Sequence, residues 1–209
     1  MFSLSALLLF ITSSILLILA PGPDIIFVVT QGITNGKKAG FFTAIGLCLG
    51  NSVHTLAAAF GLSIIFKTSE VAFVIFKTLG AFYLFYLAFK AIKHRNDTLT
   101  VNTDSKSVKH SGLLLRGFYM NVLNPKVALF FLAFLPQFVN AKHGSVPVQM
   151  ILLGLIFMIL VALIFGTLGY FAGSFGDWIL KKPKFTKAMN IVSASIFCGL
   201  GLKLLTSRR

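Results

Sequence analysis

The sequence predicts an all-α integral membrane protein in which six transmembrane helices form two inverted three-helix repeats. Three observations lead to this fold class. Hydrophobic residues make up 56% of the 209 residues and charged residues only 11%, and the mean hydropathy is +0.90. Such a chain has too few charges to cover the surface of a soluble domain. Six apolar stretches are long enough to cross a bilayer, and a short polar triplet interrupts two of them at matching points.

A helix of about 20 apolar residues crosses the hydrocarbon core of a bilayer. In chain order, the predicted spans are Leu4–Val29, Gly40–Phe66, Val71–Ile92, Leu113–Val139, Val146–Phe171 and Ala188–Leu205. The first and fourth are overlong, as expected if each consists of two half-helices, and the sixth is short. No Lys or Arg precedes the first apolar run, and no small-residue cleavage site followed by a soluble domain comes after it. We therefore expect an uncleaved first span and no secretory signal.

The two polar triplets are Gly22-Pro23-Asp24 and Asn124-Pro125-Lys126. Gly22, Pro23 and Pro125 are the predicted structural breaks. Each triplet also places an ionisable residue at membrane depth, which costs about 2.5–3.5 kcal/mol on insertion scales. Proline-interrupted helices at corresponding positions of two halves are the best sequence indication of a transporter's substrate site.

The chain divides at its longest polar stretch. Residues 94–111 are rich in Lys, Asn, Thr, Ser and Asp, and they separate a three-span half (1–93) from a second three-span half (112–209). An odd number of spans per half inserts the second half upside down relative to the first, which is the inverted-repeat architecture of several transporters. We expect one transmembrane domain over 1–209, built from these two halves.

The net charge of +14 is explained by membrane orientation, without a nucleic-acid partner. Basic residues gather in the loops after the first, third and fifth spans, and few lie on the other side. The first group is Lys37, Lys38, Lys93, Arg95, Lys106, Lys109, Lys181, Lys182, Lys184 and Lys187, and the second is Lys67, Lys142, Arg208 and Arg209. Because cytoplasmic loops carry the excess of Lys and Arg, we expect the 94–111 linker in the cytoplasm and both termini outside.

Asp24 is the acidic residue placed inside an apolar span, in the first turn of the half-helix that begins at Pro23. The helix dipole and free N–H groups stabilise its ionised form there. One interpretation is a structural cap. The other is that Asp24 meets a substrate ammonium group or carries an exchanged proton.

Lys126 occupies the matching slot after Pro125, with Asn124 as the predicted N-cap. A cation in the first turn is repelled by the helix dipole, so helix propensity does not explain it. Its ammonium group could snorkel to an interface, pair with Asp24, or hold an anionic group such as a substrate carboxylate.

Further polar residues lie near the breaks. Asn51, His54 and Thr55 share one face of the second span, Gln31 follows the first break, and Asn121 precedes the second by one turn. His54 is either a proton carrier, because imidazole titrates near neutrality, or a neutral residue hydrogen-bonded to a neighbouring helix. Aromatic residues could wall a site, or pack and face lipid: Phe82, Tyr83, Phe118, Tyr119, Phe130 and Phe134.

Glycine pairs recur in the second span of each half, as Gly46 with Gly50 and Gly169 with Gly173. Such pairs let helix backbones approach closely. Packing inside the bundle is the plain interpretation, and a homodimer face is the alternative.

Catalytic and metal-binding motifs are absent. The chain has no phosphate-binding loop, no His-Glu-x-x-His and no Gly-x-Ser-x-Gly sequence. Cys48 and Cys198 lie within apolar spans, where free Cys is commonly a small hydrophobe. We expect no enzyme activity, no metal, no cofactor and no disulfide.

The motifs resemble the lysine-exporter/homoserine–threonine-resistance (LysE/RhtB) family of bacterial amino-acid exporters. The resemblance rests on short blocks over spans one to four, and on the size and span pattern of the whole chain. The blocks are Pro21-Gly22-Pro23-Asp24, Gly40 with Gly46 and Gly50, Leu79-Gly80-Ala81-Phe82-Tyr83-Leu84, Gly117-Phe118, Asn121, Leu123-Asn124-Pro125-Lys126 and Phe134-Leu135-Pro136-Gln137-Phe138.

The resemblance implies export of amino acids or close derivatives across the inner membrane, driven by the proton-motive force. The substrate site is predicted between the two breaks, with Asp24, Lys126, Asn124, Asn121, Asn51, His54 and Gln31 binding substrate or proton. One acid opposed by one Lys favours neutral amino acids or homoserine-type compounds over lysine and arginine. A passive channel for small polar solutes is the rival function, and a membrane-embedded enzyme is disfavoured by the missing motifs.

Overall fold

The computed structural model describes residues 2–62, 70–96, 109–180 and 183–206, and within these ranges it leaves out the side chains at 173–180 and a few other positions. Every regular element in these ranges is helical, so the all-α prediction is confirmed for the described chain. The elements are α1 (Leu4–Leu19), α2 (Pro23–Thr34), α3 (Gly36–Leu56), η1 (Ala57–Leu62), α5 (Glu70–Lys93), α6 (His110–Val122), α7 (Pro125–Leu129), η2 (Phe130–Phe134), η3 (Leu135–Phe138), η4 (Ala141–His143), α8 (Val146–Leu180) and α9 (Pro183–Thr206).

The two predicted helix breaks are present. The chain bends by 58° between α1 and α2 and by 49° between α6 and the helical run that begins with α7. Ala20 and Asn124 each precede a proline and leave the helical conformation, with ψ values of 128° and 107°. A proline disfavours the helical conformation of the residue before it, which applies to Pro21 and Pro125, and a proline also fits the first position of a helix, as Pro23 does in α2 and Pro125 in α7. The same local rule therefore makes both breaks.

The number of membrane spans is confirmed in part. Gly36–Gly61 and Val146–Ala172 are long and apolar enough to cross a membrane, and the two bent pairs qualify as well if each pair is one span. The helices α5 and α9, each 24 residues long, stay predicted spans. The set of six spans and the inverted repeat therefore remain predictions.

Helix bounds differ from the predicted spans at several ends. The first span continues past Val29 to Thr34, and the fourth begins earlier than Leu113, at His110. The second span begins earlier, at Gly36, and changes from α-helix to the wider π-helix η1, while residues 63–66 of that span lie outside the described residues. The fifth helix continues past Phe171 to Leu180, because a helix does not need apolar residues once it has left the hydrocarbon. The sixth begins at Pro183, where proline is tolerated in a first turn.

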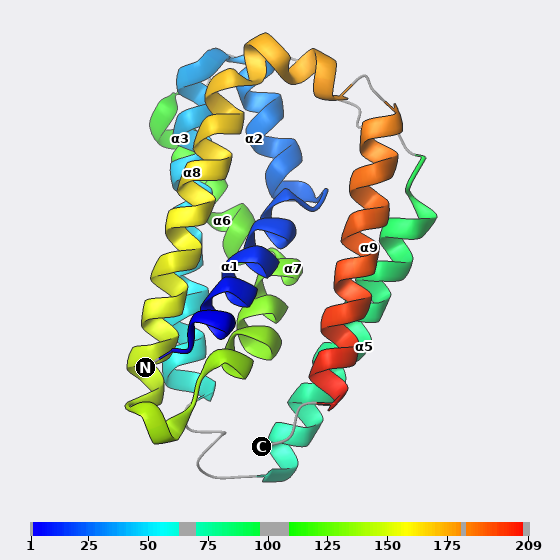
Figure 1. The fold of residues 1–209 in the computed structure, drawn as a ribbon. Coiled ribbons are helices and arrows are strands. Elements are labelled where there is room, and N and C mark those ends of the chain that lie inside the picture. The colour runs from blue at the N-terminus through cyan, green and yellow to red at the C-terminus, as the bar shows by residue number, and fades with distance from the viewer. Residues whose placement is uncertain (1, 63–69, 97–108, 181–182, 207–209) are drawn as a thin grey trace.

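Two groups of helices build the molecule. In Figure 1, α3, α6 and α8 stand together, α5 pairs with α9, and α1 and α2 slant between the two groups. Five phenylalanines with almost no exposed surface, Phe10, Phe130, Phe131, Phe134 and Phe157, form the aromatic centre of the core. Their rings contact one another at centroid distances of 5.0–6.2 Å. The helix η2, which contributes Phe130, Phe131 and Phe134, therefore serves packing.

Glycines bring the helices of the first group into backbone contact. A side chain on Gly40 would overlap the backbone of Gly169 in α8, and one on Gly46 would overlap that of Leu114 in α6. Such close approach strengthens van der Waals packing, which drives helix association in lipid. Gly46 and Gly50 thus pack inside the bundle, as does Gly169. The surroundings of Gly173 lie outside the description, and a homodimer stays a prediction that these inward-facing glycines do not support.

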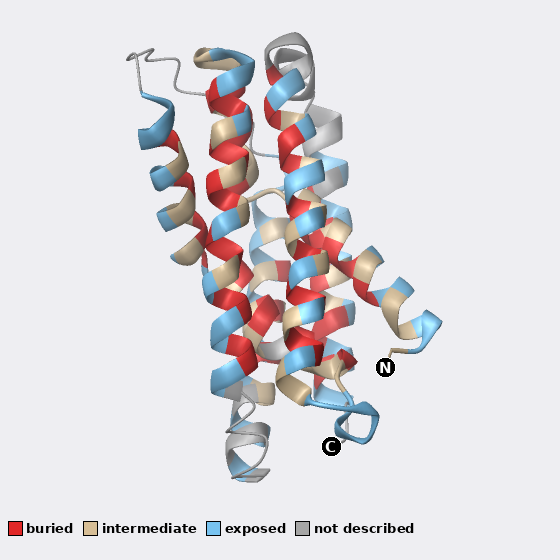
Figure 2. Cartoon of the chain, turned by 90° about the vertical axis from the view of Figure 1, so that its left-hand side faces the viewer, coloured by how far each residue is buried: buried red, intermediate tan, exposed pale blue. Residues whose placement is uncertain are grey.

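The outward faces are apolar. Figure 2 shows buried residues along the inner sides of the helices and exposed ones on the outer sides. Large hydrophobic side chains stand outside, with Leu79, Phe82 and Leu163 all more than 60% exposed. Soluble monomers rarely expose so much contiguous apolar surface, whereas lipid covers it without cost. Phe82 and Tyr119 belong to this outer surface and do not wall an inner site.

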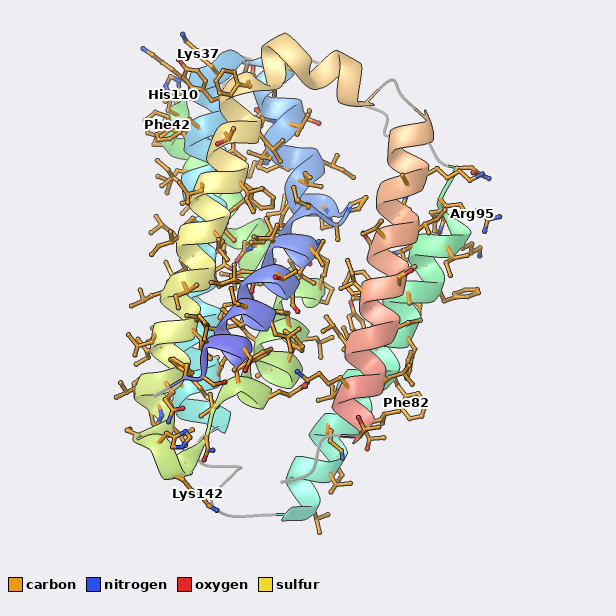
Figure 3. All side chains as sticks on the ribbon, in the orientation of Figure 1. Lys37, Phe42, Phe82, Arg95, His110 and Lys142 are labelled. Carbon is orange, nitrogen blue, oxygen red and sulfur yellow. The ribbon has the colours of Figure 1, made fainter. Side chains whose placement is uncertain are left out.

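The two ends of the bundle differ. α1 begins and α9 ends at one end, and α2, α5 and α8 end at the other (Figure 1). In Figure 3, Lys37 and Arg95 lie toward the end where α2, α5 and α8 stop, and Lys142 lies at the opposite end. This arrangement agrees with the predicted division of the basic loops, while the side that faces the cytoplasm stays a prediction.

Candidate functional site

The two helix breaks contact each other through Lys126. Its ammonium group donates hydrogen bonds to Leu17 O at 3.0 Å and Ala20 O at 2.9 Å, at the end of α1. A side chain on Gly22 would start 3.2 Å from Lys126 Nζ, so the absence of one there leaves room for the ammonium group. The breaks, about a hundred residues apart in sequence, form one structural unit.

These contacts explain why a cation is tolerated after Pro125. The last carbonyls of a helix have no partner within the helix, and its C-terminal end carries partial negative charge. Pro21 prevents α1 from continuing, so Ala20 O gains no bond from a further helical turn, while Leu17 O accepts from Ala20 N at 3.2 Å as well as from Lys126. The end of α1 thus stabilises Lys126, which its own helix α7 does not. The side chain of Asn124 completes the second break by accepting a hydrogen bond from Lys126 N at 3.0 Å.

Asp24 lies buried in the first turn of α2, with 3% of its surface exposed. Its Oδ2 accepts a hydrogen bond from Asn121 Nδ2 at 2.9 Å. Its Oδ1 is buried and has no hydrogen-bond partner among the described residues. Leaving such a group unsatisfied costs roughly 1–3 kcal/mol, and more for a charged group, so Asp24 has unused capacity to accept a donor.

Asn121 joins Asp24 to helix α3. Gly50 provides the space, because a side chain there would collide with Asn121 Cβ and Oδ1 at 2.8 Å. The His54 ring nitrogen Nε2 lies 3.1 Å from Asn121 O. Asn51 is fully buried on the same helix, and its Nδ2 donates to Leu47 O at 2.8 Å. Residues from α2, α3 and α6 thus meet at the breaks.

Unpaired polar atoms remain in this cluster. Within this cluster, three buried oxygens lack a donor and one buried nitrogen lacks an acceptor among the described residues: Asp24 Oδ1, Asn51 Oδ1, Asn121 Oδ1 and Asn124 Nδ2. An ammonium group has three N–H donors, and Lys126 uses two of them on α1. The cluster can therefore accept hydrogen bonds at the first break and donate them at the second.

The predicted site residues are largely brought together. Asp24, Asn121, His54 and Asn51 form the cluster, with Asn124 and Lys126 at the second break. Gln31 lies two turns further along α2, where its Oε1 accepts a hydrogen bond from Asn35 Nδ2 at 2.8 Å. The structure thus places Gln31 at the end of α2, outside the cluster.

The direct pair between Asp24 and Lys126, one of the roles considered for Lys126, is not formed in this structure. The ammonium group bonds to α1, and the free oxygen of Asp24 stays unpaired. Snorkelling does not describe Lys126 either, because two main-chain carbonyls hold its head group. The carbonyls of Leu17 and Ala20 are the functional groups that the sequence analysis missed. Pro21 after an apolar helix was the available signal.

No group of three or more His, Cys, Asp or Glu side chains within the described part of the chain has the arrangement of a metal site.

Comparisons with known proteins identify the family of the chain. Residues 15–208 match the family model described as LysE type translocator. The membrane protein YrhP of Bacillus subtilis strain 168 is 31% identical over 206 residues, covering 95% of this chain and 97% of that protein. A leucine efflux protein of Klebsiella pneumoniae is 28% identical over 200 residues, covering 95% and 94%, respectively. A leucine efflux protein of Salmonella typhimurium is 29% identical over 204 residues, covering 94% and 93%. No solved structure matches.

The family match covers nearly the whole chain and both helix breaks, and it confirms the resemblance found in the sequence motifs. The chain is a membrane protein that belongs to the family of LysE type translocators.

Proposed function

We propose that this protein exports neutral amino acids or close derivatives, of the leucine, threonine or homoserine type, in exchange for protons. It does so across the bacterial inner membrane, with both termini outside and the 94–111 linker in the cytoplasm. Family membership and the leucine efflux relatives support amino-acid export. The substrate binds between the two breaks.

The observation that carries this proposal is the set of unpaired polar atoms at the breaks. A zwitterion presents an ammonium group, which needs acceptors, and a carboxylate, which needs donors. Asp24 Oδ1 and the oxygens of Asn51 and Asn121 supply acceptors. Asn124 Nδ2 and the third N–H of Lys126 supply donors. Both halves of an amino acid's head group thus have partners.

The charges at the site support a neutral substrate. Asp24 is the acid at the breaks, and it faces the ammonium group of the substrate. A side-chain cation such as that of lysine would need a further anion. Outward movement of each net positive charge also costs about 2.3 kcal/mol per 100 mV against an inside-negative potential.

Asp24→Asn tests the acceptor role. Asparagine keeps the size of the side chain and an oxygen for Asn121 Nδ2, but it removes the charge. Loss of one charged hydrogen bond of about 1.5–3 kcal/mol predicts about a 10- to 150-fold drop in export at subsaturating leucine. Thr34→Val on the same helix is the control, because Thr34 Oγ1 donates to Thr30 O and accepts from Asn35 Nδ2 at the far end of α2, away from Asp24. Normal leucine export by the Asp24→Asn protein, at equal membrane levels, would reduce Asp24 to a structural cap.

Reconstituted vesicles separate the exporter from the passive channel. Leucine accumulation against its own gradient that stops when a protonophore is added excludes a pore. Accumulation that never exceeds equilibrium would favour the channel.

A resistance screen tests substrate preference. Strains that overexpress the chain should survive toxic levels of leucine, threonine or homoserine analogues. Resistance confined to lysine or arginine analogues would contradict the proposed neutral substrate.

A further inference from the structure

The two half-helices that end at the breaks have their C-terminal carbonyls bound in the same way. α1 ends with carbonyls bonded to the ammonium group of Lys126. α6 ends with Asn121 O, which accepts hydrogen bonds from Asn124 N at 2.9 Å and from the imidazole of His54. In both cases a basic side chain from another helix binds the negative end of a half-helix. Lys126 uses its ammonium group for two of these bonds, whereas the His54 ring uses one nitrogen and keeps a second nitrogen that can bind a proton.

The hydrogen bond fixes the tautomer of His54. A carbonyl oxygen can only accept, so Nε2 carries the hydrogen and donates it to Asn121 O. Nδ1 is then the basic nitrogen of the neutral ring, and it makes no hydrogen bond to the described residues. A proton can therefore bind to Nδ1 without breaking the contact with α6. The ring is held in place by Phe131, at a centroid distance of 5.8 Å.

The surroundings of His54 contain one charge that acts on it directly. Asp24 of α2 is hydrogen-bonded to the same Asn121 that the His54 ring contacts, so an imidazolium at this position would face the negative charge of Asp24. Titratable or charged groups on the other elements packed against α3 have their own partners or face outward. Among the described residues these groups are His110, which lies beside Phe42, Arg116, which lies over Phe27, the exposed Tyr119, Lys126, which is bonded to carbonyls of α1, and Tyr170, which lies beside Lys37.

We propose that His54 carries the exchanged proton on Nδ1, while Asp24 is the counter-ion of the substrate ammonium group. This inference rests on the proposed function and divides its two tasks between two residues. The proton binds to Nδ1 on one side of the membrane and leaves Nδ1 on the other, and Nε2 stays bonded to Asn121 O throughout. Imidazolium and substrate ammonium compete for the single negative charge of Asp24, because two cations beside one carboxylate repel each other. Proton and substrate therefore occupy the site alternately, as an exchange mechanism requires.

His54→Gln tests the division of tasks. Glutamine can donate a hydrogen bond to Asn121 O but cannot carry a proton near neutral pH. The purified protein is placed in vesicles with radiolabelled leucine, and two rates are measured. In leucine exchange without a pH gradient, the variant still works, because Asp24 remains. In accumulation driven by one pH unit, the wild type reaches about tenfold at one proton per leucine, and the variant accumulates none.

The outcomes separate this inference from the proposed function. Tenfold accumulation by His54→Gln would overturn the role of His54 while leaving proton-coupled export intact. Loss of exchange as complete as in Asp24→Asn would also overturn it, because His54 would then be needed to position the site. Exchange without accumulation supports it. His143→Gln, in the exposed η4 turn, is the matched control and should behave as wild type in both assays.

Discussion

Lys126→Met gives the sharpest test of how the breaks are held together. Methionine has a similar length but no donor, so the carbonyls of Leu17 and Ala20 lose their bonds to Nζ at 3.0 and 2.9 Å. Side-chain hydrogen bonds in membrane proteins average about 0.6 kcal/mol and reach about 1.7 kcal/mol. Two such bonds therefore predict a loss of about 1–3.5 kcal/mol in the free energy of unfolding. The upper part of this range is expected, because the donor is charged and the carbonyls end a helix.

The loss is measured by SDS titration of the purified protein in lipid–detergent micelles, with circular dichroism at helix wavelengths. Lys142→Met is the control, since Lys142 is exposed and its only described hydrogen bond comes from its backbone N–H. A Lys126→Met protein that unfolds at the same SDS concentration as the control would refute the proposed stabilisation of α1 by the ammonium group.

Three further predictions concern packing, the limits of the site and orientation. Gly40→Ala should lower stability by about 1–3 kcal/mol in the same titration, because its new methyl group overlaps the backbone of α8, whereas Gly166→Ala meets nothing within 4 Å and should not. Gln31→Ala should export leucine at the wild-type rate, since the described hydrogen bond of its side chain is to Asn35 at the end of α2. A loss of export as large as that of Asp24→Asn would show that Gln31 belongs to the site. A reporter active only in the cytoplasm should work when fused in the 94–111 linker and fail after Arg209, and the reverse would invert the proposed orientation.

The sequence predicted those features that local rules decide. A proline after Ala20 and another after Asn124 act on the preceding residue and end a helix, so both breaks were predictable to within a residue. Apolar composition predicted the outer surface in the same way. The C-terminal end of α8 was not predicted, because hydropathy indicates which part of a helix lies in the membrane and not where the helix ends. This helix continues to Leu180.

Partners across the fold could not be predicted from sequence. The matching positions of Asp24 and Lys126 suggested an ion pair, yet the ammonium group is hydrogen-bonded to the carbonyls at the end of α1 instead. Every residue has a backbone carbonyl, so the sequence does not indicate which of them bind a distant side chain. The grouping of Asn121 and His54 with Asp24 was predicted only as proximity to the breaks. Its geometry depends on Gly50, which lets α6 approach α3.

The contact between Lys126 and α1 also bears on how the chain is assembled in the membrane. Ala20 and its partner Lys126 are 106 residues apart. At a synthesis rate of 5–20 residues per second, the end of α1 waits about 5–20 s before its partner is made. During that time its last carbonyls must accept hydrogen bonds from water or from the insertion machinery, because lipid tails have no hydrogen-bond donor. The prolines can bend the first span as soon as it is made, but the end of α1 gains its charged hydrogen-bond donor only after the fourth span has been inserted.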